Sequence, residues 1–227
     1  LVLAKRRQPS AGPEDAPAPR ADGSFRPRFA DEPLTTADVC NEIIKPATKA
    51  KRCAYIDLLM AGAVPEVGGA ADVGDSTDFI SHAWKYDFKL LVSALEAARL
   101  PADRFLWVDC VVVNQHVNND AGFEWWSTTF RESVASIGST LLVLTPWSAP
   151  EALVRVWCIF EVWATVVTGT SLRVLLPAAE RDAFVEALLR DFELLDRLLE
   201  LDVAKAQAFN PADKDNIFKA INASVGF

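Results

Sequence analysis

Residues 78–84 read Asp-Phe-Ile-Ser-His-Ala-Trp, and this stretch decides the fold class of the 227-residue chain. A short apolar run breaks here into polar residues, and a charged segment with helical periodicity follows. In α/β proteins, polar residues directly after a buried strand lie at the carboxyl edge of the sheet, where ligands bind. The stretch therefore predicts a strand over residues 77–81 with candidate binding groups immediately after it.

From residue 77 onward, apolar segments with strand character alternate with segments of helical periodicity. Further strands are predicted over residues 105–109, 140–144 and 171–176, and helices over residues 86–99, 125–137, 155–167, 179–201 and 211–223. A polar loop with several asparagines is predicted after the second strand. Strands and helices that alternate at this spacing predict an α/β fold with a doubly wound parallel sheet.

The flanking segments differ in composition from this alternating region. Residues 1–33 hold six of the 13 prolines and few large apolar residues, so we expect an extended Pro-rich arm that is disordered unless its own domain or a partner holds it. Residues 34–76 are predicted as a helical lead-in, divided by Pro46 and followed by a glycine-rich loop. The α/β domain then spans residues 77–177, and residues 178–227 form a helical C-terminal extension.

Composition narrows the classes of function. A net charge of −8 argues against a nucleic-acid partner, which would require a basic face. No apolar run reaches the roughly 18 residues of a membrane helix, so we do not expect the chain to span a membrane. The four cysteines and two histidines lack the spacing of metal ligands, so no metal site is predicted. Cysteines scattered through apolar segments are typical of buried thiols in an intracellular protein, and we expect a cytoplasmic one. The basic first ten residues fit an ordinary tail or the remnant of a transit peptide, which would imply an organelle.

Four segments, in order, resemble the characteristic segments of TIR domains. Residues 78–84 are similar to the first TIR strand, which often contains Phe-Ile-Ser, and residues 105–109 resemble the second strand with its terminal aspartate. Residues 140–144 are similar to the third strand. Residues 157–162, which read Trp-Cys-Ile-Phe-Glu-Val, resemble the Trp-Cys-x-x-Glu-Leu helix of plant-type members. Within the family, the chain resembles TIR-like proteins of algae and other protists. The resemblance implies a flavodoxin-like sheet.

The resemblance also implies a chemistry. Many TIR domains cleave the nicotinamide–ribose bond of NAD, so NAD is expected as a substrate, with no cofactor and no metal. The residue that matches the family's catalytic glutamate is Glu161, and a carboxylate there can stabilise an oxocarbenium-like centre. Ser81, His82, Trp84 and Asp109 would line the NAD-binding pocket, where the Trp84 ring can stack on a base.

Each candidate also has a structural interpretation, and the sequence leaves the choice open. Glu161 fits a helix glutamate that pairs with Arg155, His82 fits a loop histidine that orders the strand end, and Cys158 fits a buried thiol. The chain is accordingly either an NAD-cleaving enzyme, a TIR-type interaction or signalling module that self-associates, or a structural subunit of a larger complex. In the last two cases residues 1–33 would serve as a docking arm for a protein partner.

Overall fold

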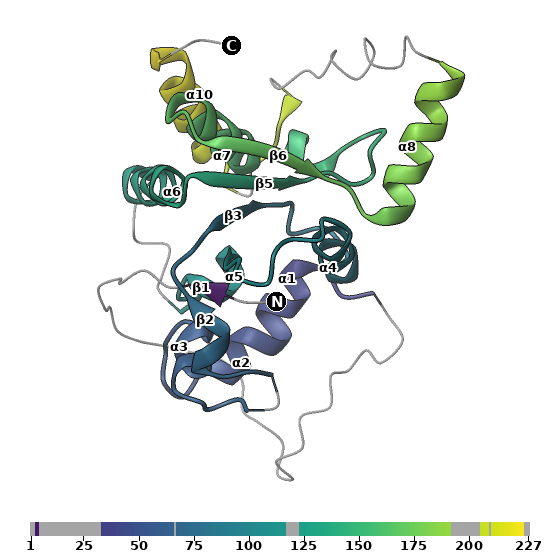
Figure 1. The fold of residues 1–227 in the computed structure, drawn as a ribbon. Coiled ribbons are helices and arrows are strands. Elements are labelled where there is room, and N and C mark those ends of the chain that lie inside the picture. The colour runs from purple at the N-terminus through teal and green to yellow at the C-terminus, as the bar shows by residue number, and fades with distance from the viewer. Residues whose placement is uncertain are drawn as a thin grey trace.

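The computed structural model describes residues 3–4, 33–65, 67–116, 123–191, 205–208 and 210–224. Within these residues, parallel strands form one sheet in the order β2-β1-β4-β3-β5-β6 (Figure 1). The strands are β1 Leu3–Ala4, β2 Val73–Gly74, β3 Asp78–Ser81, β4 Leu106–Trp107, β5 Ser139–Val143 and β6 Ser171–Leu175. The α/β class with a parallel sheet, which the alternation predicts, is confirmed.

Helices occupy the segments before, between and after the strands. They are α1 Thr36–Asp38, α2 Lys45–Thr48, α3 Tyr55–Met60, α4 Phe88–Ala97, α5 Asp109–Val112, α6 Phe123–Ile137, α7 Val156–Val167, α8 Ala178–Arg190 and α10 Pro211–Ser224. The predictions that match α4, α6, α7 and α10 are confirmed to within two residues at each end. Helix α8, within the helix predicted over residues 179–201, ends at Arg190 because Asp191 adopts an extended backbone, and residues 192–201 of that prediction lie outside the described residues. Among the described residues, no helix is both long and apolar enough to cross a bilayer.

Strand β3 lies in the hydrophobic core, and each of its residues is buried. The Phe79 ring stacks on Trp107 of β4 with 4.7 Å between ring centroids, and Phe130 of α6 meets both rings edge-on. Helices α6 and α4 lie on opposite sides of β3 (Figure 1). A strand that is covered on both faces has no polar side, which explains the continuous apolar run in the sequence.

The second predicted strand is shorter than expected. Strand β4 ends at Trp107, and Asp109 begins the short helix α5 instead of ending the strand. The amide groups of Val111 and Val112 both donate to the carbonyl group of Val108, which closes a helical turn. Asp109 therefore lies at the amino end of a helix, where a carboxylate is favoured by unpaired amide groups.

The lead-in helix continues through Pro46 instead of dividing there. Residues Val39–Ile44 form π-helical turns, and the amide group of Lys45 donates to the carbonyl group of Cys40. The missing amide group of Pro46 thus falls where the helix returns to α-geometry, a place that tolerates its loss. The helix ends only after Thr48.

The predicted N-terminal arm contributes a strand to the sheet of its own chain. Leu3 of β1 pairs in parallel register with Val73 of β2 and with Leu106 of β4. Residues 5–32 lie outside the described residues. Strand β2 falls in the predicted glycine-rich loop, and Gly74 has no room for a side chain because the Phe105 ring lies 2.5 Å from the position of a Cβ atom.

The carboxylate of Asp78 ties together three segments where β3 begins. It accepts hydrogen bonds from Arg104 Nε and Nη2 at 2.7 and 2.6 Å, from Ser139 Oγ at 2.7 Å and from Thr77 Oγ1 at 2.9 Å. Burial opposes ionisation of Asp78, but these hydrogen bonds and the charge of Arg104 outweigh it and hold the pKa below its ordinary value. The group therefore stays ionised in the folded protein.

We predict that Asp78→Ala lowers the free energy of unfolding by about 2 kcal/mol at neutral pH, because the donors lose their acceptor. The cost is smaller than that of breaking a sealed ion pair, since the Arg104 side chain is 35% exposed. The wild-type contribution is complete above about pH 4 and is lost as the pH falls. Urea unfolding measures this. Glu186→Gln, which removes an exposed ion pair of α8, is the control, and an equal effect of both variants would contradict the prediction.

Candidate functional site

A direct contact between β3 and α7 joins two of the predicted site residues. Ser81 is the last residue of β3, and its Oγ donates a hydrogen bond of 2.5 Å to Oε2 of Glu161, 80 residues further along the chain. Side chains two residues apart in a strand share a face, so Ser81 points the same way as Phe79, toward the layer that holds α6 and α7. Glu161 faces the strand from the middle of α7. It forms no ion pair with Arg155 among the interactions of the described residues.

The carboxyl group of Glu161 is held in the protein interior. Only 6% of the residue is exposed. Burial raises the pKa of Glu161 well above its ordinary value, the hydrogen bond from Ser81 acts in the opposite direction, and the charge of Asp109 raises it further. Glu161 consequently keeps its proton to a higher pH than an exposed glutamate. Such a shift, with a nearby carboxylate as one cause, is typical of functional carboxyl groups.

Asp109 orients the ring of Trp84. The indole Nε1 of Trp84 donates to Oδ2 of Asp109 at 2.7 Å, and the backbone amide of Cys110 donates to Oδ1 at 2.7 Å. Both carboxylate oxygens are thus engaged with the protein. The half-buried Trp84 ring is held in one orientation at the carboxyl side of β3, as a rigid stacking surface requires.

His82 and Cys158 complete the buried cluster. Cys158 Sγ donates to the carbonyl group of His82 at 3.4 Å, and both residues are buried. Burial raises the pKa of Cys158 well above its ordinary value, which keeps the thiol protonated and supports the buried-thiol interpretation over a nucleophile. Burial also lowers the pKa of His82, against the charge of Asp109. The Nε2 atom of His82 has no hydrogen-bond partner among the described residues.

No family model, curated protein or solved structure gives a significant match to this chain.

Tyr86 is a further residue of the site, and no sequence motif predicts it. Its hydroxyl group donates to the carbonyl group of Val143 at 3.3 Å and accepts from the amide groups of Thr145 at 3.2 Å and Ala152 at 3.0 Å. Burial raises the pKa of Tyr86 to about 12, so the hydroxyl stays protonated. Tyr86 thereby fixes the carboxyl end of β5 beside that of β3. Nothing in the local sequence signals this role, because the partners are backbone groups far along the chain.

The lead-in helix also holds the loop that follows β3. The amide groups of Thr36 and Ala37, at the start of α1, donate to the carbonyl groups of Tyr86 and Trp84 at 3.0 and 3.1 Å. The loop after β4 is tied to the same lead-in, since His116 Nε2 lies 2.7 Å from Thr48 Oγ1. Loops that are held at several points present their side chains in a defined geometry.

We predict that Glu161→Gln changes how stability depends on pH. The raised folded pKa of Glu161 means that the wild type loses stability as the pH rises from about 4.3, the ordinary value, to the folded pKa, by about 1.4 kcal/mol per unit of difference. The amide cannot ionise, so Glu161→Gln should gain stability relative to the wild type as the pH rises above about 4.3, until the folded pKa of Glu161 is passed. Urea unfolding across this range measures the difference. Glu132→Gln, on the exposed face of α6, should follow the wild type, and a parallel curve for Glu161→Gln would refute the prediction.

Proposed function

We propose that this protein cleaves the nicotinamide–ribose bond of NAD, with Glu161 as the key carboxyl group. The observation that carries the proposal is the buried contact of 2.5 Å between Ser81 and Glu161 at the carboxyl end of β3. A carboxyl group that is costly to bury and whose pKa is raised fits a catalytic role better than a packing role.

The order of the strands supports a TIR-like, flavodoxin-like assignment. Numbered along the predicted α/β domain, β4-β3-β5-β6 is the order second-first-third-fourth, which is the flavodoxin-like arrangement. The chain proceeds from β3 to β4 on one side and then crosses to β5 on the other. Ligands of open α/β sheets bind at such a reversal, outside the carboxyl ends of the strands. Ser81 ends β3 at this reversal, and the loop that Tyr86 holds follows β5.

The proposed reaction assigns a separate role to each side chain. The C–N bond to the ribose breaks, nicotinamide leaves as a neutral molecule with the bonding electron pair, and the ribosyl centre acquires oxocarbenium character. Ionised Glu161 stabilises that positive charge or accepts a hydrogen bond from a ribose hydroxyl. Water then adds to the ribosyl carbon and releases a proton. Ser81 orients the carboxyl group of Glu161, and Trp84 stacks on a ring of the substrate.

Asp109 acts through its neighbours in this proposal. Both of its oxygens are engaged by Trp84 and Cys110, so it positions the Trp84 ring instead of contacting NAD. Burial is the main cause of the raised pKa of Glu161, and the charge of Asp109 raises this pKa further.

A second candidate function, the interaction module or structural subunit, is favoured by the edge of the sheet. Strand β6 is the last strand in the order, and its residues 171–174 are exposed, with Leu172 at 42% and Val174 at 50%. Val166 of α7 is also exposed, at 65%. An exposed edge strand with apolar side chains is a template for pairing with another chain.

Nicotinamide release separates the two functions. We expect the wild type to release nicotinamide from NAD, and Glu161→Gln to lose about 100-fold in rate, the scale of removing one group that stabilises charge in the transition state. The measurement is chromatography of the nucleotide products. Glu132→Gln, a matched substitution on the exposed face of α6, should retain the wild-type rate. Absence of release at high protein concentration, or equal release by wild type and Glu161→Gln, would favour the interaction module.

The rate should rise with pH through the raised pKa of Glu161, because the ionised form stabilises the positive charge. Asp109→Asn removes a charge that raises this pKa, while its amide oxygen can still accept from Trp84. The rising limb should therefore move to lower pH. The pH profile of kcat/KM tests this, with Asp182→Asn on the exposed surface of α8 as control. An unchanged limb, or one displaced to higher pH, would rule out the assigned coupling.

A further inference from the structure

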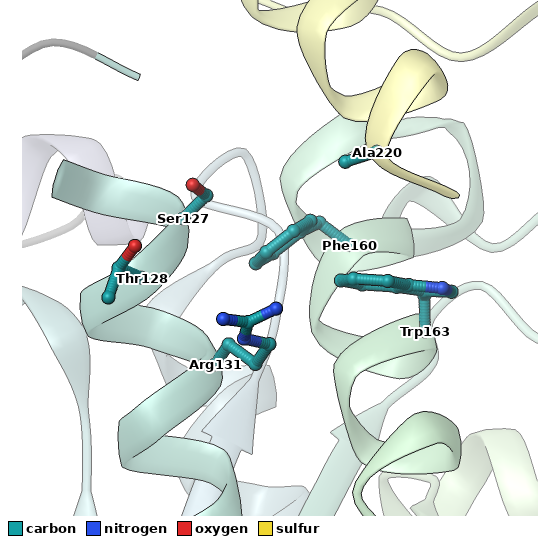
Figure 2. A pocket seen from close by; sticks show the side chains of 6 residues that line it. All are labelled: Ser127, Thr128, Arg131, Phe160, Trp163 and Ala220. Carbon is teal, nitrogen blue, oxygen red and sulfur yellow. The ribbon is translucent and has the colours of Figure 1, made fainter. Parts of the chain in front are cut away.

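A small cavity, separate from the Ser81–Glu161 contact, opens between α6, α7 and α10. It has a volume of about 120 Å³. Its lining residues come from three helices: Ser127, Thr128 and Arg131 of α6, Phe160 and Trp163 of α7, and Ala220 of α10 (Figure 2). One wall is thus polar and cationic, and the opposite wall is aromatic.

The polar wall follows from helix geometry. Ser127 and Thr128 precede Arg131 by four and three residues, so the three side chains share one face of α6. Figure 2 shows Arg131 reaching from α6 into the space beside the rings of Phe160 and Trp163. Among the described residues, Arg131 forms no ion pair. The acidic neighbours on α6 are Glu132, which points to another side of the helix, and Glu124, two turns or about 10 Å away.

The aromatic wall is preorganised. The Phe160 and Trp163 rings lie 5.1 Å apart between centroids, and Phe160 is itself buried. Trp163 Nε1 donates to Ser224 Oγ of α10 at 2.8 Å, and Ser224 Oγ donates to the carbonyl group of Ile221 at 2.9 Å. A ring that is already held by hydrogen bonds loses little conformational freedom when a ligand packs against it.

We propose that this cavity, which we call the α6–α7 cavity, binds an aromatic carboxylate with a single ring. A guanidinium group recognises a carboxylate through two parallel hydrogen bonds. The Thr128 hydroxyl group supplies a further donor, whereas the Ser127 hydroxyl group already donates to the carbonyl group of Glu124 at 3.1 Å. The partly exposed Trp163 ring supplies a surface for a planar ring, and the buried Phe160 ring supports it from behind. The cavity of about 120 Å³ is somewhat smaller than the roughly 150 Å³ of an apolar cavity that holds one benzene molecule, so it admits no more than a single ring. Within the part of the chain that the structure describes, no ion pair compensates the charge of Arg131, which locally offsets the repulsion that a net charge of −8 exerts on anions.

The ligand class predicts a pattern across three probes. The chain has seven tryptophans, and Trp163→Phe assigns the indole N–H resonance of Trp163 in a two-dimensional nitrogen–proton spectrum. Benzoate should shift this resonance in a saturable way. Benzamide keeps the ring but lacks the charge, and acetate keeps the charge but lacks the ring. Each should bind at least about tenfold more weakly than benzoate.

Arg131→Gln should weaken benzoate binding about tenfold and leave benzamide binding unchanged, because a charge-assisted pair is lost and the aromatic wall is kept. Arg131 is exposed, so the variant should fold, and the unshifted resonances of the other tryptophans verify this. Arg190→Gln, which removes the same charge from α8, is the matched control and should bind benzoate like the wild type. The proposal is overturned if benzoate gives no saturable shift, if benzamide binds equally well, or if both arginine variants weaken benzoate alike. These readouts do not depend on NAD cleavage.

Discussion

A carboxyl group in a protein interior needs a hydrogen-bond partner, and Glu161 finds it in the Ser81 hydroxyl group at 2.5 Å. The same face of α7 makes a second contact one turn earlier, where the Cys158 thiol donates to the carbonyl group of His82. Two side chains on one helix face therefore meet two consecutive residues at the end of β3. This double contact sets the position of α7 over the sheet and brings the acid to the carboxyl edge, where strand β3 ends.

The surroundings of this contact come from distant parts of the chain. The amide groups at the start of α1 hold the carbonyl groups of Trp84 and Tyr86, the Tyr86 hydroxyl holds the end of β5, and Asp109 at the start of α5 holds the Trp84 ring. The lead-in before residue 77 thus belongs structurally to the candidate site. At the amino ends of the strands, the carboxylate of Asp78 accepts a hydrogen bond from Ser139 and so joins β3 to β5.

The elements that sequence analysis predicted well are those with a clear local period. Strand β3 and helix α7 were predicted to within one residue at each end, because burial on both faces of the strand and along the inner face of the helix leaves a pattern in neighbouring residues. The errors have identifiable causes. Pro46 indicated a break that the π-helical turns avoid, and Asp109 looked like the end of a strand although it begins a helical turn. The pairing of β1 between β2 and β4 had no signal, because a strand of two residues has no period to detect.

The sequence by itself determined the α/β class, the positions of the central strands and the identity of the candidate residues, since these depend on local hydrophobic patterns and on short motifs. The tertiary structure decided how those residues relate to one another. It placed Ser81 against Glu161 across 80 residues, engaged both oxygens of Asp109 with the protein, and brought Tyr86 to the end of β5. It also raised the pKa of Glu161, because burial and the nearby charge of Asp109 arise only when separate elements pack together.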